Sequence, residues 1–147
     1  MRKTAQNVFN KTFYEIEYNP ELNIIDTFWI GYSSQADLKK ACQLGLELTQ
    51  QVKCPYKLND NALFTGPWES AVPWLKKEWL PKAVEAGVRY LAHVALPDSF
   101  GEQAGEVMQV SLIGQLLQVR IFTSREAGLI WLKSCQQVNG HLQPSFA

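Results

Sequence analysis

The strongest constraint on the fold is an alternation between short strand-like segments and longer segments of helical periodicity in the second half of the chain. Extended segments are predicted at 56–64, 89–96 and 116–122, and a helical segment follows each of them. Strands separated by helices pair in parallel through right-handed crossovers. The order therefore predicts an α/β domain with parallel crossover strands in its sheet.

The N-terminal third predicts a hairpin that joins this sheet. Residues 12–18 alternate between apolar and charged side chains, and residues 23–30 are rich in β-branched and aromatic side chains, with Asn-Pro-Glu turn chemistry at 19–21. The predicted order is β-β-α-β-α-β-α-β-α, a mixed sheet with an N-terminal hairpin and three parallel crossover strands. We predict a single domain over 1–147, with its core at about 12–134, a flexible N-terminus and a flexible C-terminal tail.

Capping residues and prolines set the expected helix boundaries. Ser33 or Ser34 is predicted to cap a helix, with Asp37 three residues after Ser34 as a capping-box variant, and Ser99 with Glu102 forms a second capping box. Pro81 lies inside the helical segment that follows the strand at 56–64. Since proline cannot donate the backbone hydrogen bond of a continuous helix, we expect a kink or a new helix start there.

Composition excludes several functional classes. Lys plus Arg equals Asp plus Glu at 14 each, and the basic residues are scattered, so no footprint for nucleic acid or an anionic membrane is present. No apolar run approaches the ~18 residues of a membrane span, and residues 1–8 have no signal-peptide core. Cys42, Cys54 and Cys135 form no Cys-x-x-Cys pair. We expect a cytoplasmic protein without a disulfide framework.

Two segments carry a family resemblance. The sequences EWLPKAVEAGVRYLAHV at 78–94 and IFTSREAGLIWL at 121–132 resemble the SpoIIAA-like group. These are bacterial stand-alone domains of the STAS fold, often described together with Sec14-type lipid carriers. The first segment resembles that family's helix, glycine and buried strand, and the second resembles its last strand and closing helix. The resemblance covers roughly residues 12–134 and implies the fold rather than a chemistry.

The resemblance also raises the question of whether the chain has the phosphorylation motif of the best understood STAS-fold proteins. These proteins are anti-anti-sigma factors, which bind a kinase partner and are switched by phosphorylation of a serine in an Asp-Ser pair after the third strand. The corresponding stretch here is Asn59-Asp60-Asn61, with Asn61 at the serine position, and Thr65 is the nearest hydroxyl. We therefore do not expect a phosphorylation switch.

Motifs for catalysis are absent from the sequence. It contains no Gly-x-Ser-x-Gly and no glycine-rich phosphate-binding motif. Its two histidines, His93 and His141, are too few and too distant for a metal site. His93 lies in the middle of a predicted strand, so we predict a buried histidine with satisfied hydrogen bonds. We expect no cofactor and no metal; the alternative is a small enzyme that uses Asp60, Asp98 or His93.

Geometry offers two indications of a binding surface. Ligands of open α/β sheets favour the carboxyl ends of the parallel strands, where we expect the Asn59–Asn61 triplet and Asp98. Trp74 lies about 120° from the helical stripe of Trp68 and Trp79, so we expect it at the flank of the helix or exposed. The tentative binding residues are Asn59, Asp60, Asn61, Thr65, Trp68, Trp74 and Asp98.

These features predict a non-enzymatic binding or regulatory domain. It would recognise a protein partner or a small apolar ligand through the strand-end loops and the region 68–79. Pairing of two copies as a homodimer is a further expectation, since small domains often associate symmetrically.

Overall fold

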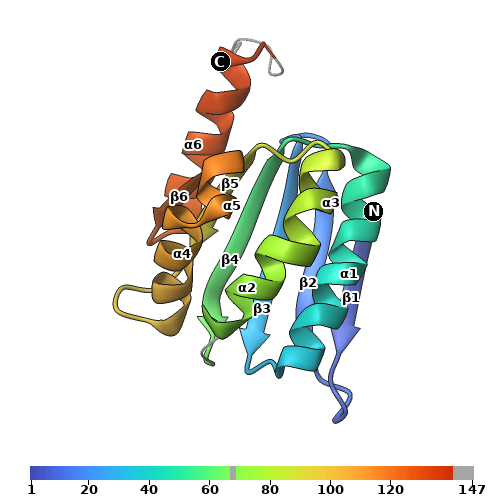
Figure 1. Cartoon of the computed structure of the whole chain (residues 1–147). Helices are drawn as coiled ribbons and strands as arrows, with labels where there is room; N and C mark the ends of the chain where they lie inside the picture. Colours follow the sequence, from blue (N-terminus) through green and yellow to red (C-terminus); the bar gives the residue numbers. More distant parts are fainter. Residues whose placement is uncertain (67–68, 141–147) are drawn as a thin grey trace.

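The computed structural model describes residues 1–66 and 69–140, which build one six-stranded mixed sheet with helices on both faces (Figure 1). The strands lie in the order of the sequence: β1–β2–β3 are antiparallel neighbours, and β3–β4–β5–β6 are parallel. The predicted α/β class, the hairpin β2–β3 and the parallel crossover strands are confirmed. The strand bounds are Arg2–Gln6 (β1), Thr12–Asn19 (β2), Ile24–Gly31 (β3), Tyr56–Phe64 (β4), Tyr90–Val94 (β5) and Gln118–Phe122 (β6).

Strand β1 corrects the prediction of a flexible N-terminus. It pairs with β2 along its whole length, from Arg2 opposite Glu17 to Gln6 opposite Thr12. Ala5 is its one buried apolar side chain. Because the rest of β1 is polar, the apolar pattern that identifies a strand is missing from its sequence.

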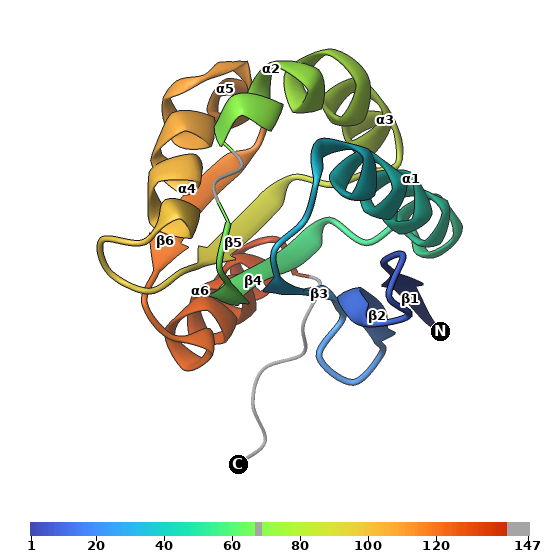
Figure 2. The same ribbon diagram turned by 90° about the horizontal axis from the view of Figure 1, so that it is seen from below.

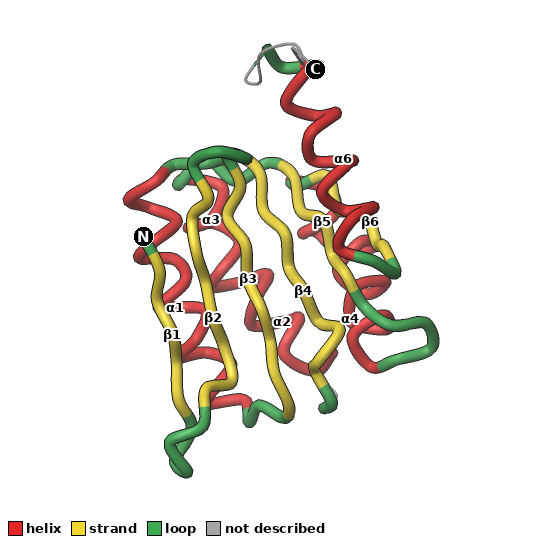
Figure 3. Tube along the Cα trace, turned by 180° about the vertical axis from the view of Figure 1, so that it is seen from behind, coloured by secondary structure: helices red, strands yellow, loops and turns green. Residues whose placement is uncertain are grey.

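The helices divide unequally between the two faces of the sheet. Figure 2 shows α1 to α5 on one face and α6 on the other, and we call these the α1–α5 face and the α6 face. Figure 3 shows α6 crossing only one end of its face, near β5 and β6. The bounds are Gln35–Val52 (α1), Val72–Trp74 (α2), Leu80–Glu85 (α3), Phe100–Val110 (α4), Leu112–Leu116 (α5) and Arg125–Val138 (α6). None of the helices in the described ranges could span a membrane.

The helix starts follow the capping residues. Ser34 Oγ accepts a hydrogen bond from the Asp37 backbone N–H at 3.1 Å, and Ser99 Oγ accepts one from Glu102 N–H at 3.1 Å. Both predicted capping positions are confirmed, and they fix where α1 and α4 leave the carboxyl ends of their strands.

The segment between β4 and β5 is broken, as Pro81 predicts, but the break has an unexpected form. A 3-10 turn at Glu69–Ala71 precedes α2, and a π-helical turn at Leu75–Trp79 separates α2 from α3. Pro81 has no N–H to bond to the carbonyl four residues earlier, and its ring crowds that carbonyl. The wider π-helical turn accommodates this loss just before the proline.

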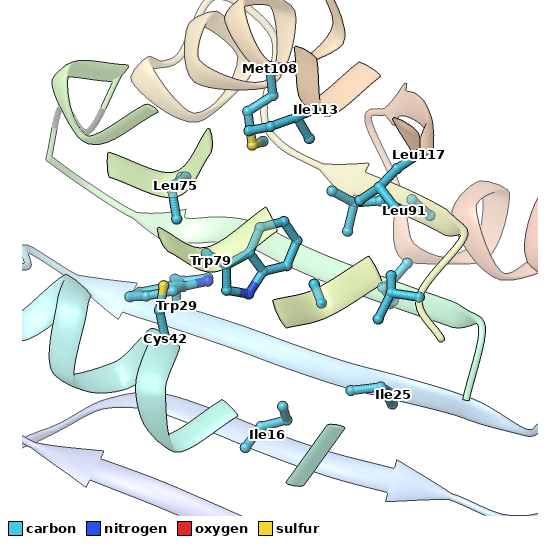
Figure 4. Close-up of a cluster of buried hydrophobic side chains, with 14 of the residues drawn as sticks. Ile16, Ile25, Trp29, Cys42, Leu75, Trp79, Leu91, Met108, Ile113 and Leu117 are labelled. Atoms are coloured by element: carbon cyan, nitrogen blue, oxygen red, sulfur yellow. The ribbon is translucent and has the colours of Figure 1, made fainter. Parts of the chain in front are cut away.

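The main hydrophobic core lies between the sheet and the α1–α5 face. Figure 4 shows side chains from the sheet, from α1, from the π-helical turn and from the segment 108–117 meeting in this layer. Glycines allow the close approach of α4: a Cβ at Gly105 would lie 2.5 Å from His93 Cδ2. The core therefore brings helices directly against polar side chains of the central strands.

Candidate functional site

The Asn59–Asn61 triplet lies inside a strand, which corrects its predicted position at a strand end. Strand β4 continues through all three residues, and all three are buried, with 8%, 5% and 2% of their surface exposed. Successive side chains of a strand alternate between faces. Asn59 therefore points to the α1–α5 face, and Asp60 points to the α6 face.

The triplet does disturb the strand, as its polar pattern indicates. Phe28 pairs with Asp60, whereas Ile30 pairs with Leu63, so the β3–β4 register shifts by one residue just after Asp60. This is a β-bulge, and the Asp60 carboxylate caps it by accepting a hydrogen bond from the Ala62 N–H at 2.9 Å.

On the α1–α5 face, Asn59 is the centre of a hydrogen-bond network. Its Oδ1 accepts from Trp29 Nε1 at 2.9 Å, and its Nδ2 lies 3.1 Å from Asn61 Oδ1 and 3.0 Å from His93 Nδ1. The other ring nitrogen of His93 lies 2.7 Å from the Gly101 carbonyl oxygen. A carbonyl only accepts, so His93 carries its proton on Nε2.

His93 is thus a neutral core histidine, as predicted. Burial lowers its pKa to about 4, despite the hydrogen bond to Gly101 and the nearby charge of Asp60. Both ring nitrogens have partners within the protein. His93 therefore has no nitrogen available to act as a general base.

On the α6 face, Asp60 belongs to an ion-pair network. Arg125, the first residue of α6, binds Asp26 through two hydrogen bonds of 2.6 and 3.1 Å and binds Asp60 at 3.0 Å. Its guanidinium also lies 4.5 Å from the ring centroid of Phe28. Burial raises the pKa of Asp26, although Arg125 opposes that shift. These contacts attach the start of α6 to β3 and β4.

The other predicted site residues are not brought together. Thr65 and Asp98 are exposed in separate loops, and the Asp98 N–H donates to Glu102 Oε1 at 3.0 Å. Trp74 is half-buried, with Lys39 Nζ 5.7 Å from its ring centroid. Trp68 lies outside the described residues.

A small, partly open cavity lies within the α1–α5 face, beside the main core. Its volume is about 40 Å³, and its walls come from the central strands, α1, the π-helical turn and α4. Figure 4 shows the tryptophans and the thiol that line it. The lining residues are Tyr14, Trp29, Leu38, Cys42, Lys57, Asn59, Leu75, Trp79, Leu91 and Met108.

Lys57 is the one basic side chain on this wall. It extends from β4 and is 7% exposed, and its Nζ lies 5.2 Å from the ring centroid of Trp79. Its ammonium group has neither a hydrogen-bond acceptor nor an acidic partner within residues 1–66 and 69–140. Burial lowers the pKa of Lys57 to about 8, because an apolar environment disfavours the charged form.

Sequence reasoning missed Lys57, although a signal was present. The strand at 56–64 was predicted to lie inside a parallel sheet, and such strands are covered on both faces. Positions 57, 59 and 61 therefore share one buried face, and all three are polar. A lysine at such a position is held away from bulk water, and that is the signal.

Comparisons with known proteins do not identify this chain. No family model matches it, and no curated protein and no solved structure gives a significant match. The described residues contain no group of three or more side chains suited to a metal ion.

Proposed function

We propose that the chain is a non-enzymatic binding domain for a small, largely apolar ligand, which it holds in the cavity beside Lys57. The observation that carries the proposal is a buried cation on the wall of an otherwise mostly apolar cavity. An ion without a partner costs several kcal/mol to bury. A bound molecule that provides that partner would offset the cost.

The cavity wall has the composition of a ligand pocket. Such pockets are lined mainly by apolar and aromatic side chains, with a few polar groups that orient the ligand. Here Tyr14, Trp29 and Trp79 provide the aromatic surface, and Lys57 and Asn59 provide the polar groups.

The size of the cavity limits what can bind without movement. It measures about 40 Å³, whereas a cavity of about 150 Å³ accommodates benzene. A larger ligand therefore requires the wall to move. The wall segment best suited to this is the stretch Val72–Glu85, in which α2, the π-helical turn and α3 are too short to be stable alone.

The fold is part of the same proposal. We assign the sheet to the SpoIIAA-like, STAS-type group on the resemblance at 78–94 and 121–132. The hairpin and parallel crossover strands support this assignment, and β1 is an addition to the predicted order. The association of that group with Sec14-type lipid carriers agrees with an apolar ligand.

Native mass spectrometry of the freshly purified chain tests the function. We expect an additional mass that disappears on denaturation, and we expect Cys42→Leu, which fills the cavity, to abolish it. Cys135→Leu is the matched control, because Cys135 is similarly buried but lies on α6 away from the cavity. Circular dichroism checks that both variants fold.

Three results would count against the proposal. One is retention of the ligand by Cys42→Leu. Another is a wild-type chain that carries no ligand and takes up none from a panel of small apolar compounds. A ligand-free homodimer would favour self-association as the function instead.

A further inference from the structure

The surroundings of Lys57 leave its ammonium group without an acceptor that the protein can easily supply. Asn59 is the one amide side chain on the cavity wall, and its Oδ1 already accepts from Trp29 Nε1 at 2.9 Å and from Thr27 Oγ1 at 3.2 Å. If Asn59 turned toward Lys57, the buried Trp29 N–H would lose its partner. Thr27 Oγ1 would keep the Leu58 carbonyl oxygen at 2.7 Å. The missing acceptor therefore has to come from outside the described chain.

Two other polar groups face the cavity, and neither offers a negative charge. Burial raises the pKa of the Cys42 thiol to about 12 and the pKa of Tyr14 well above its ordinary value. Both groups are therefore neutral near pH 7. The cavity has a single positive charge on its wall and nothing to balance it.

We propose that the ligand is a small apolar carboxylic acid whose carboxylate forms a salt bridge with Lys57 inside the cavity. This inference rests on the proposed function and adds the chemical class of the ligand. A carboxylate accepts charge-assisted hydrogen bonds from an ammonium, and these are stronger when water is excluded. The apolar body of the acid would contact Trp29 and Trp79, which line the same cavity.

Charge matching favours a carboxylate over a phosphate. The cavity wall contains one cation, and no second basic side chain lines it. A phosphate group carries close to two negative charges at neutral pH, so one of them would be buried without a partner. A monocarboxylate balances the charge of Lys57 and leaves none over.

Water is the competing occupant. A cavity of about 40 Å³ has room for about three or four water molecules, at roughly 10–15 Å³ for each. Such waters would solvate the ammonium group without any ligand. This alternative predicts that the protein has no preference between an acid and a neutral molecule of the same length.

Calorimetric titration of the full chain with hexanoate and with 1-hexanol separates these possibilities. At pH 7 we expect hexanoate to bind at least about tenfold more tightly than hexanol, since only hexanoate pairs with Lys57. Lys57→Met should abolish that preference while hexanol still binds. Lys82→Met is the matched control, because Lys82 is exposed on α3 and does not line the cavity.

The pH dependence of binding gives a second readout. With the pKa of Lys57 at about 8 in the free protein, hexanoate affinity should be constant from pH 6 to about 7.5 and fall about fivefold between pH 8 and pH 9. Tyr14 on β2 and Cys42 on α1 stay neutral over this range, and the lining residues of the π-helical turn, β5 and α4 do not titrate. Hexanol binding should not change with pH.

A third readout needs only the wild-type chain. The Lys57 side-chain carbon resonance in ¹³C-lysine-labelled protein reports the pKa directly, and we expect hexanoate to raise that pKa toward the ordinary lysine range. Equal binding of acid and alcohol, or an unchanged Lys57 pKa with hexanoate bound, would overturn the carboxylate inference and leave the apolar-ligand function standing. If neither probe binds the wild-type chain, both proposals fail.

Discussion

The Arg125 and Lys57 side chains lie against strand β4 on opposite faces of the sheet. Arg125 has acidic partners, and Lys57 has none among the described residues. On the α6 face, Arg125 makes three hydrogen bonds to the carboxylates of Asp26 and Asp60. On the α1–α5 face, Lys57 makes none within the described residues. The side chain of Arg125 is 35% exposed, whereas Lys57 is only 7% exposed, so the more deeply buried cation is the one that lacks an acid.

Stability alone does not explain this difference. The cost of burying an ion rises with burial, so a fold arranged for stability would give the carboxylates to the deeper cation. The Arg125 network joins α6 to β3 and β4 and is understandable as a structural contact. Because burial lowers the pKa of Lys57, we expect its charge to destabilise the empty protein, and in our proposal a bound partner offsets that cost.

Removing the paired cation should have the largest effect. Arg125→Leu leaves Asp26 and Asp60 close together without a counterion, and we expect a loss of about 3 kcal/mol in the free energy of unfolding at pH 7, at the low end for buried pairs because Arg125 is partly exposed. Urea unfolding measures this. The loss should shrink as the pH approaches about 4, where carboxylates take up protons.

Arg2→Leu is the matched control for Arg125. It breaks another arginine–carboxylate pair, with Glu15, but the arginine side chain there is 56% exposed. Exposed pairs contribute little, so we expect a change of about 0.5 kcal/mol or less. Equal losses in the two variants would show that the Arg125 network is not a special contact.

Removing the unpaired cation should have the opposite sign. Lys57→Met keeps most of the side-chain volume and removes the buried charge, so we expect the free energy of unfolding to rise by about 2 kcal/mol at pH 7. The same measurement on the ligand-free chain checks it. A loss of stability would mean that Lys57 is stabilised by contacts that the described residues do not reveal, and the comparison of the two faces would fail.

The effect of Lys57 should also depend on pH. Its pKa is about 8 in the folded chain and about 10.4 in an unfolded one. Between these values the unfolded chain binds more protons, so the stability of the wild type rises with pH. The advantage of Lys57→Met should therefore be full below about pH 7 and disappear above about pH 11, where both states of the wild type are neutral.

Much of the fold could be predicted from the sequence, because its elements are specified locally. Capping at Ser34 and Ser99 and the apolar periods placed the helices and five of the six strands close to their observed bounds. The exceptions were β1, which has one buried apolar side chain, the π-helical turn before Pro81, and α5, which was predicted as the end of α4 and the start of β6. Strand β1 depends on pairing with β2, which its own sequence pattern does not show, and the π-helical form of the break at Pro81 is not specified by the apolar period.

The site was less predictable, because its meaning depends on which side chains meet. The sequence identified Asn59, Asp60 and Asn61 as unusual, and the structure shows them in a bulged, buried strand rather than in a loop. Their partners Trp29, His93 and Arg125 come from other strands and from α6. That Lys57 lacks an acidic partner among the described residues could be identified only from the structure. This lack depends on which side chains surround Lys57 in the core.

The smallest expected change in the free energy of unfolding comes from replacing either of the two carboxylates that bind Arg125. Burial raises the pKa of Asp26 in spite of Arg125, so its ionised form is only weakly supported, and Asp26→Asn should cost about 0.5 kcal/mol at pH 7. Because the pKa of folded Asp26 is raised, the folded chain takes up a proton at a higher pH than the unfolded chain does. The wild type should therefore gain stability over Asp26→Asn as the pH falls toward 4.

Asp60→Asn is the comparison. Both Asp60 oxygens accept hydrogen bonds, from Arg125 and from the Ala62 N–H, so an amide group loses one of these bonds at a more buried position. We expect a cost of about 1.5 kcal/mol there. Equal costs for the two variants in urea unfolding would show that the deeper burial of Asp60 and its Ala62 hydrogen bond add no stability.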